Sequence, residues 1–269
     1  MTRSSFTDAS GTREYVLYRP ATVTAESRAL VVMLHGCTQS ADDFARGTRM
    51  NEAAERGGFL VLYPEQSAAN HPQKCWNWYA PDHAHRAKGE VGLLAGLVDS
   101  VMQAEHILAA RIAVVGMSAG GAIAGNLVAA YPERFGALVV HSGIPALAAL
   151  DLGAALKAMR EGATAGDGLA DQVVISMGTH ARAMPVLALH GADDKVVLPS
   201  NLDRIVEQWT AVNARVSPSV PTPVEKQLIP GVGHAWSGGS ADGTYTAPSG
   251  ADATGMIVAF LKRVGVLRA

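Results

Sequence analysis

The stretch Gly116-Met117-Ser118-Ala119-Gly120 contains the residue types of a nucleophilic catalytic site. It follows the apolar run 112–115 and precedes the small-residue run 121–130, which predicts a strand, a sharp turn and a helix. In that setting the pattern G-x-S-x-G is typical of a nucleophile elbow, which holds a serine hydroxyl above the edge of a sheet. The flanking glycines fit, because larger side chains would collide where strand and helix cross. The alternative is a glycine-rich crossing in an ordinary α/β domain.

A serine nucleophile needs a general base, and the base needs a carboxylate to orient it. In this kind of fold the acid and then the histidine follow the serine along the chain. The apolar run 185–189 is followed by two aspartates, and we expect Asp194 to be the acid because its position leaves a turn to aim the carboxylate back over the sheet. Asp193 is the alternative. His234, in the loop after the run 224–229, is the predicted base.

Acyl transfer also needs backbone N–H groups that bind the oxyanion of the tetrahedral intermediate, each lowering the barrier by roughly 3–4 kcal/mol. One donor is expected to be Ala119, directly after the serine, and the other to lie in the loop after the early strand. That loop reads His35-Gly36-Cys37, and Cys37 is the preferred donor. A competing interpretation makes Cys37 itself the nucleophile, but it has neither an elbow nor a neighbouring base in the sequence.

Four aromatic residues stand in loops near the predicted site. Trp76, Trp78 and Tyr79 share one irregular stretch, and Trp236 lies two residues after the predicted base. Tryptophan usually packs in a core, but clustering on loops favours a hydrophobic cleft for an acyl or alkyl group. Gln39 is a further candidate for substrate binding.

Two cysteines, Cys37 and Cys75, suffice for one disulfide and not for a disulfide scaffold. They either join the oxyanion loop to the aromatic loop or remain two buried thiols. The histidines at 83 and 85, beside an aspartate at 82, resemble a metal site only faintly, because loop histidines without a third ligand usually bind nothing. We expect no metal and no cofactor. His35 and His190 each open a His-Gly turn, where a histidine more often holds a loop through hydrogen bonds.

Composition narrows the class of protein. A chain of 269 residues is expected to form a single catalytic domain over 1–269. A hydrophobic fraction of 48% with 17% charged residues excludes a disordered chain, and a net charge of −2 gives no support for binding nucleic acid or a membrane surface. No apolar run reaches the roughly 18 residues of a membrane span. The first six residues do not resemble a signal peptide, so the sequence is that of either an exported protein in its mature form or a cytoplasmic protein. We expect a secreted or periplasmic protein, with a cytoplasmic protein as the alternative.

Apolar runs that alternate with helical patterns predict an α/β fold with a mostly parallel, twisted sheet flanked by helices. The weak alternation at 14–18 predicts an antiparallel edge strand, and 65–90 reads as a long functional loop. The segment 144–183 breaks the rhythm and is expected to be a small inserted cap with a helix at 152–159. The other expected strands are 29–34, 59–63, 112–115, 137–140, 185–189 and 224–229, and the other expected helices are 42–56, 94–101, 121–130, 201–212 and 252–264.

Several runs together resemble one known family: LHGCTQSADDF, RMNEAAERGGFLVLYPEQS, CWNWY, GMSAGGAIAGNLVAAYPERF, HGADDKVV and GVGHAWSGGS. They are similar to the poly(3-hydroxybutyrate) depolymerase-type esterases of the α/β-hydrolase superfamily. These are related to the feruloyl and acetylxylan esterases of carbohydrate esterase family 1. The resemblance covers nearly the whole chain and is weakest over 144–183.

The resemblance implies a role for each matching residue, namely Ser118 as nucleophile, Asp194 as acid, His234 as base, Cys37 and Ala119 as oxyanion donors, Cys37 and Cys75 as a disulfide, and Trp76 and Trp78 in an aromatic crevice. Secreted polymer-degrading members differ from this chain in carrying a linker, a substrate-binding module and an export signal. These departures count against action on solid polymer and leave oligomers and soluble esters as substrates.

We therefore expect a serine esterase that forms an acyl-enzyme on hydroxyalkanoate oligomers or polyesters. A feruloyl or acetylxylan-type esterase with promiscuous action on aromatic polyesters is the alternative. A non-catalytic binding protein usually lacks a triad member, and a peptidase usually adds a propeller or large lid, so both are less favoured. The expected partner is a small or oligomeric ester, with no nucleic acid and no membrane, and the expected state is a monomer or weak homodimer.

Overall fold

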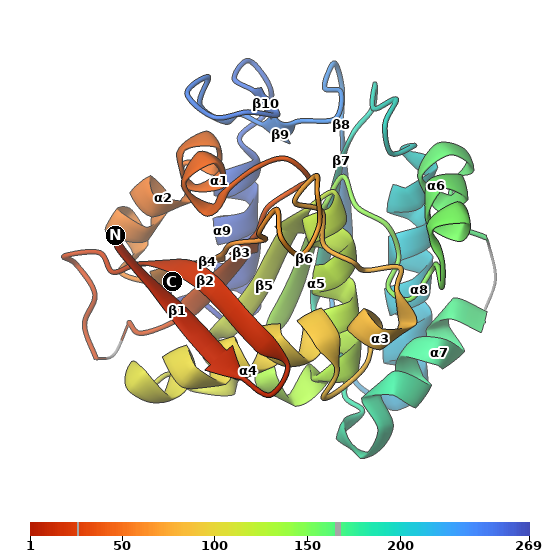
Figure 1. Ribbon diagram of the computed structural model, residues 1–269, viewed down its shortest axis with the longest axis horizontal. Coiled ribbons are helices and arrows are strands. Elements are labelled where there is room, and N and C mark those ends of the chain that lie inside the picture. Colours follow the sequence, from red (N-terminus) through yellow and green to blue (C-terminus); the bar gives the residue numbers. More distant parts are fainter. Residues whose placement is uncertain (26, 165–167) are drawn as a thin grey trace.

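A single eight-stranded sheet runs through the computed structural model, which describes residues 1–25, 27–164 and 168–269 (Figure 1). The strand order is β1-β2-β4-β3-β5-β6-β7-β8. Pairing is antiparallel from β1 to β4 and parallel from β4 to β8, which confirms the predicted α/β fold. The strands are β1 (Thr2–Asp8), β2 (Gly11–Tyr18), β3 (Leu30–Leu34), β4 (Leu60–Pro64), β5 (Ile112–Met117), β6 (Ala137–His141), β7 (Val186–Gly191) and β8 (Val224–Ile229).

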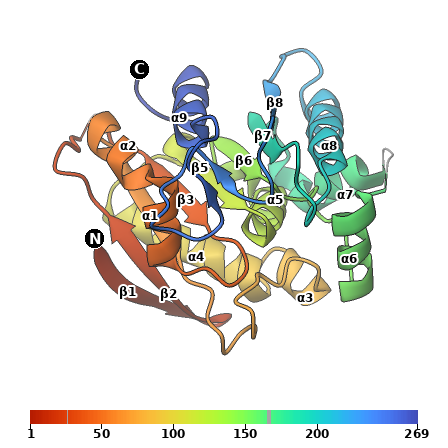
Figure 2. The same ribbon diagram turned by 90° about the horizontal axis from the view of Figure 1, so that it is seen from above.

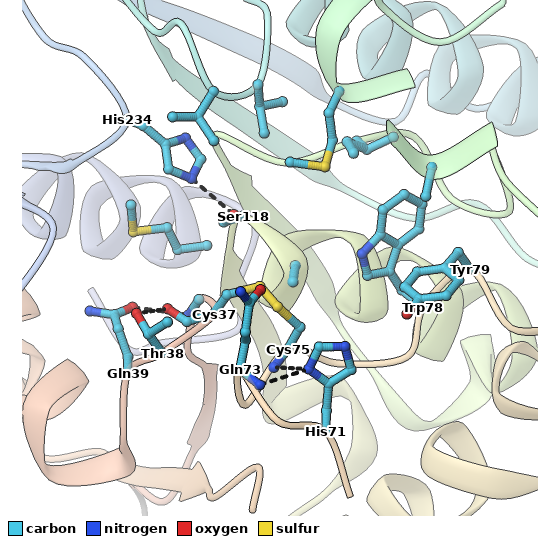
Figure 3. Close-up of a pocket in the computed structure, with 18 of the residues that line it drawn as sticks. Cys37, Thr38, Gln39, His71, Gln73, Cys75, Trp78, Tyr79, Ser118 and His234 are labelled. Atoms are coloured by element: carbon cyan, nitrogen blue, oxygen red, sulfur yellow. Dashed lines mark hydrogen bonds between the residues drawn. A yellow bond between two sulfur atoms is a disulfide. The ribbon is translucent and has the colours of Figure 1, made fainter. Parts of the chain in front are cut away.

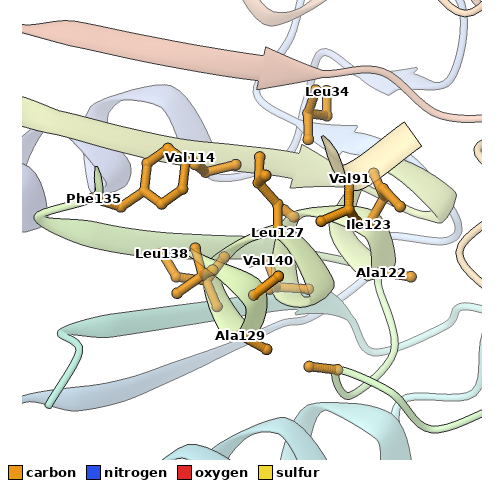
Figure 4. Close-up of a cluster of buried hydrophobic side chains, with 14 of the residues drawn as sticks. Leu34, Val91, Val114, Ala122, Ile123, Leu127, Ala129, Phe135, Leu138 and Val140 are labelled. Carbon is orange, nitrogen blue, oxygen red and sulfur yellow. The ribbon is translucent and has the colours of Figure 1, made fainter. Parts of the chain in front are cut away.

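Helices cover both faces of this sheet. Side chains alternate between the faces along each strand, so the continuous apolar runs of the central strands make both faces apolar. In β3, Leu30, Val32 and Leu34 pack into one hydrophobic cluster and their neighbours pack into the other. Figure 4 shows part of the first cluster, and Figure 2 shows α9 and α4 on opposite sides of the strands. The helices of eight or more residues are α1 (Ala41–Thr48), α2 (Met50–Gly57), α4 (Gly89–Ala104), α5 (Ala119–Ala130), α6 (Leu152–Glu161), α7 (Gly168–Met177), α8 (Ser200–Val216) and α9 (Ala253–Arg263). Among the described residues, none of the helices is long and apolar enough to cross a membrane.

The N-terminal edge of the sheet differs from the prediction. The strand expected at 14–18 exists as β2, but β1 lies outside it and forms the true edge. Six of the seven β1 residues are exposed. A strand with no buried face shows no apolar alternation, so the pattern gave no signal for β1.

Two segments expected to be irregular or inserted contain additional helices. The stretch 65–90 includes the short helix α3 (Pro81–Ala84) and the start of α4. The segment 144–183 contains α6, which confirms the predicted helix at 152–159, and also α7, which was not predicted. Both helices contact α8 at the side of the sheet away from β1 (Figure 1). Residues 165–167 of the expected cap lie outside the described residues.

The turn between β5 and α5 is the elbow that the sequence predicts. Ser118 adopts φ 56° and ψ −123°, a backbone conformation that side-chain-bearing residues rarely take. A Cβ on Gly116 would lie 2.1 Å from the carbonyl oxygen of Gly120, and a Cβ on Gly120 would lie 2.0 Å from that of Leu34. The two glycines are therefore required because three segments of backbone meet at this point.

Replacing Gly120 by alanine is expected to lower the free energy of unfolding by about 3 kcal/mol or more, because the added methyl group overlaps the end of β3. Chemical denaturation followed by circular dichroism measures this loss. Gly168→Ala is the matched control, since a Cβ there meets no atom within 4 Å. Equal stability of the two variants would contradict the close crossing.

Candidate active site

Three side chains that the sequence predicts as a catalytic group form one hydrogen-bonded chain. His234 Nε2 lies 2.9 Å from Ser118 Oγ (Figure 3), and His234 Nδ1 lies 2.7 Å from Asp194 Oδ2. Because a carboxylate only accepts hydrogen bonds, Nδ1 carries the imidazole proton and Nε2 is free to accept the serine proton. The three residues are far apart in sequence and come from the ends of β5, β7 and β8, which all reach the same edge of the sheet.

The carboxylate of Asp194 is fixed on both oxygens. Its Oδ1 accepts hydrogen bonds of 2.9 Å from the backbone N–H groups of Val196 and Val197, and its Oδ2 lies 3.3 Å from His190 Nε2. Burial by itself would raise the pKa of Asp194, but the hydrogen bonds from His190 and His234 outweigh it and hold that pKa well below its usual range. Asp194 is therefore charged at neutral pH. The sequence alternative, Asp193, is exposed and makes no contact of this kind among the described residues.

The two predicted oxyanion donors stand on either side of the serine. Ala119 is the first residue of α5, and its N–H belongs to the unpaired first turn of that helix. Gly36 approaches so closely that a Cβ on it would lie 3.5 Å from Ser118 Cβ, which places the next residue, Cys37, beside the nucleophile. Within the described part of the chain, neither the Ala119 N–H nor the Cys37 N–H forms a hydrogen bond. Both are free to bind a developing oxyanion.

Covalent and hydrogen bonds tie the oxyanion loop to its neighbours. A disulfide joins Cys37 to Cys75, which settles the choice that the sequence left open (Figure 3). The backbone N–H of Thr38 donates to the carbonyl of Gln73 at 2.6 Å. Gln39, a predicted substrate contact, does line the cleft, but its Oε1 accepts from Gly36 N–H at 2.9 Å. Its amide is therefore occupied in holding the loop.

The serine opens into a cleft of about 550 Å³ that is largely apolar. The lining residues within the described chain include no Lys, Arg, Asp or Glu. Trp78 and Tyr79 lie on this cleft as predicted from the sequence, with their rings packed edge to face (Figure 3). The other apolar side chains of the lining are Met117, Ile144, Leu152, Ala155, Leu156, Met159, Val196 and Val197.

The other two predicted cleft aromatics lie in the interior, and that part of the prediction is corrected. Trp76 is 0% exposed and donates its indole N–H to the carbonyl oxygen of His35 at 2.9 Å. Trp236 is 1% exposed, stacks on His141 and donates to Thr254. Neither lines the cleft. The loop that carries Trp76, Trp78 and Tyr79 has no regular secondary structure, so the direction of each ring depends on tertiary contacts such as the hydrogen bond from Trp76 to His35.

Sequence reasoning missed other residues of the cleft. Leu152, Leu156 and Met159 come from α6, where the spacing of apolar residues could have indicated a helix face turned toward the site. His71 and Tyr245 come from loops and carry no comparable signal. Tyr245 lies edge to face with the ring of His234 at a centroid distance of 6.5 Å.

The histidines at 83 and 85 make no metal cluster with their neighbours. The described residues contain no group of three or more His, Cys, Asp or Glu placed to hold a metal ion. His83 Nδ1 instead accepts a hydrogen bond from the Glu90 N–H at 3.3 Å. This bond lies at the N-terminus of α4 and has a structural role there.

A mostly parallel sheet, a serine elbow and a Ser-His-Asp arrangement at the carboxyl edge of the strands together define the α/β-hydrolase class. Residues 13–220 match the family described as esterase PHB depolymerase, and the chain belongs to that family.

Named relatives agree with this membership, and a solved structure shares the fold. The chain is 29% identical over 216 residues to poly(3-hydroxyalkanoate) depolymerase C of Paucimonas lemoignei, covering 77% of this chain and 50% of the relative. It is 27% identical over 218 residues to feruloyl esterase B of Thermothelomyces thermophilus, covering 76% and 73%. Its fold matches that of an acetyl xylan esterase from Aspergillus awamori with a TM-score of 0.74, at 20% identity, covering 87% and 94%. The chain spans about half the length of the first curated relatives it matches.

Replacing Asp194 by asparagine is expected to lower kcat by about 10⁴-fold for any ester that the chain hydrolyses, because the neutral amide no longer fixes the reactive tautomer of His234. Steady-state kinetics measures the loss. The matched control is Asp193→Asn, which changes the exposed neighbour and is expected to leave kcat within twofold. A large loss in the control variant would instead assign the acid to Asp193.

Removing the disulfide with the double substitution Cys37→Ser and Cys75→Ser is expected to lower the free energy of unfolding by about 4 kcal/mol, because the bond closes a loop over a sequence separation of 38. Thermal unfolding with and without reductant measures the effect. Reductant should lower the Tm of the wild type and leave that of the double variant unchanged. A wild-type Tm that stays the same after the disulfide has been reduced would contradict the prediction.

Proposed function

We propose that this chain is a serine esterase that hydrolyses neutral carboxylic esters, with hydroxyalkanoate oligomers or polyesters as the favoured substrates. One observation carries the proposal: Ser118, hydrogen-bonded through His234 to Asp194, opens into a cleft whose described lining has no carboxylate, ammonium or guanidinium. An uncharged, largely apolar cleft favours the repeating aliphatic ester of a hydroxyalkanoate chain. The names of the relatives point to the same reaction class.

The proposed reaction runs through a covalent acyl-enzyme. His234 Nε2 takes the proton of Ser118 as its Oγ attacks the ester carbonyl carbon. The N–H groups of Ala119 and Cys37 bind the oxyanion, and Asp194 stabilises the imidazolium that forms. The bond to the alcohol oxygen then breaks, and the alcohol leaves with the proton from His234. A water molecule, deprotonated by the same histidine, attacks the acyl-enzyme and releases the acid and the serine.

A second candidate substrate class is a phenolic or acetyl ester of plant cell walls. Trp78 and Tyr79 offer aromatic faces at the cleft, which would suit a feruloyl group or an aromatic polyester. The larger share of the apolar lining is aliphatic and comes from α6 and the segments beside it, which favours the aliphatic ester. The two classes therefore differ in which wall of the cleft they use.

The setting in which the protein acts is also proposed. A disulfide persists in oxidising compartments, so the Cys37–Cys75 bond supports a secreted or periplasmic location over a cytoplasmic one. The Ser-His-Asp group and both oxyanion donors come from one chain, so the proposed mechanism runs in a monomer or a weak homodimer alike.

The substrate proposal is tested by the kcat/KM of a matched panel: methyl esters of the 3-hydroxybutyrate dimer and trimer, the corresponding free acids, methyl ferulate and acetylated xylan. The neutral hydroxybutyrate esters are expected to exceed methyl ferulate by tenfold or more, which is about 1.4 kcal/mol of transition-state preference. They are also expected to exceed their own free acids, because the cleft lining offers no cation for a terminal carboxylate. Faster hydrolysis of methyl ferulate would transfer the assignment to the phenolic class.

Ser118→Ala is the control for the whole panel. It removes the nucleophile and is expected to abolish hydrolysis of every member while leaving the circular dichroism spectrum unchanged. A peptide anilide assayed beside the esters separates esterase from peptidase activity. Retention of most ester hydrolysis in the Ser118→Ala variant would overturn the mechanism, and preferential cleavage of the anilide would overturn the reaction class.

A further inference from the structure

A buried histidine that takes no part in the proton transfer lies directly behind the oxyanion loop. His35 is the first residue after β3, is 0% exposed and does not line the cleft. Its Nε2 lies 3.0 Å from the backbone nitrogen of Gln66, and its Nδ1 lies 2.7 Å from the carbonyl oxygen of Gly36. Both ring nitrogens are therefore bound to backbone groups of neighbouring loops.

These two partners leave the ring only one protonation state that satisfies both. The Gln66 N–H can only donate, so Nε2 must be the unprotonated acceptor. The remaining proton then lies on Nδ1, which donates it to the Gly36 carbonyl. Burial lowers the pKa of His35, which agrees with a neutral ring. The imidazole thus acts as a fixed hydrogen-bond donor toward the oxyanion loop.

The carbonyl that His35 holds belongs to the same peptide unit as the proposed oxyanion donor. The peptide between Gly36 and Cys37 is trans, as are the other peptide bonds of the described chain. In a trans peptide the C=O and N–H point in opposite directions. Binding of the Gly36 oxygen by the buried ring therefore turns the Cys37 N–H away from the interior, toward the side of the loop on which Ser118 lies.

The neighbouring peptide is held equally firmly. The carbonyl of His35 accepts the indole N–H of Trp76 at 2.9 Å, and the N–H of Gly36 donates to Gln39 Oε1 at 2.9 Å. Both peptide units around Gly36 therefore have fixed orientations. The second of them, between Gly36 and Cys37, carries the N–H of the expected oxyanion donor.

A buried ion pair supports the segment that binds the ring. Arg13 of β2 donates to the carbonyl of Glu65 at 3.0 Å and to the side chain of Gln66, and its Nη2 lies 3.5 Å from Glu90 Oε1. Gln66 also donates its side-chain amide to the carbonyl of Cys75 at 3.0 Å. Buried ion pairs add little net stability, whereas this one fixes the position of the backbone N–H that sets the His35 tautomer.

We propose that His35 is a positioning residue that orients the Gly36–Cys37 peptide so that the Cys37 N–H binds the oxyanion. This inference rests on the proposed serine-esterase mechanism, because it concerns the transition state of that reaction. His35 acts through the peptide and does not touch the substrate. Its effect is therefore expected in kcat and not in KM, since an oxyanion donor binds the transition state more strongly than the ester.

The test compares His35→Leu with His35→Asn, two variants whose side chains branch in the same way at Cγ. Asparagine keeps an N–H donor on Cγ, where Nδ1 stands in histidine, and leucine has none. Hydrolysis of p-nitrophenyl butyrate is measured per active site, with the active fraction titrated by a fluorophosphonate. The leucine variant is expected to lose about tenfold to hundredfold in kcat with KM within threefold, and the asparagine variant to recover most of that loss.

A second readout separates positioning from general destabilisation. Butylboronic acid forms a tetrahedral adduct with an active serine and mimics the transition state, so its Ki should rise in the leucine variant by a factor similar to the loss in kcat. Asn213→Leu is the matched control. Asn213 is buried on α8 and makes two hydrogen bonds of 2.8 Å to the backbone of Met184, so its loss costs stability without involving the cleft. Its kcat per active site and boronate Ki are expected to match the wild type.

The outcomes are distinct. A wild-type protein that does not hydrolyse the ester, or a Ser118→Ala variant that does, overturns the proposed function and with it the role of His35. With that function established, a normal kcat and a normal boronate Ki in His35→Leu overturn the positioning role. An asparagine variant whose kcat is no higher than that of the leucine variant also overturns it, because restoring the N–H donor on Cγ would then have no effect on the reaction.

Discussion

The contact between the end of β3 and the start of α5 is the constraint on which the site depends. Gly120 meets the carbonyl of Leu34 so closely that no side chain can intervene. Because Leu34 is followed directly by the loop that contains Cys37, and Ser118 lies two residues before Gly120, one crossing brings the proposed nucleophile and its proposed oxyanion donor together. The unusual backbone conformation of Ser118 is the strain that this crossing imposes, and it is retained because the surrounding backbone leaves no alternative.

Charge is distributed unevenly around this crossing. The cleft that receives a substrate has no charged side chain among its described lining residues, whereas Asp194, Arg13 and Glu90 are buried behind it. Each of these buried charges is bound by hydrogen bonds or an opposite charge, as burial requires. Charge in this structure therefore holds the loops and His234 in place, and the cleft in which a substrate is proposed to bind is largely apolar.

The residues that could distinguish one ester from another come from a different part of the chain than the residues that react. The elbow, Asp194 and His234 follow β5, β7 and β8, whereas the aliphatic wall of the cleft comes largely from α6, between β6 and β7. The family match over residues 13–220 shows an esterase family, but the relatives are named for different esters, so the comparisons support the reaction class more firmly than the substrate.

The sequence by itself determined the parallel sheet and the turn at Ser118, and it predicted the order of serine, acid and base, because these depend on local patterns: apolar runs, paired glycines and residues directly after strand ends. It did not find β1, which has no buried face, or α7, although the buried residues Ala170, Val173 and Met177 of α7 are at helical spacing. The orientation of loop side chains was decided only by tertiary structure. Trp76 and Trp78 are two residues apart in the same loop, yet one donates to His35 in the interior and the other lines the cleft. Asp194 is buried against His190 and His234 whereas its neighbour Asp193 is exposed, and the two cysteines pair because separate loops converge. Each of these outcomes depends on contacts between segments distant in the sequence, and no local pattern encodes them.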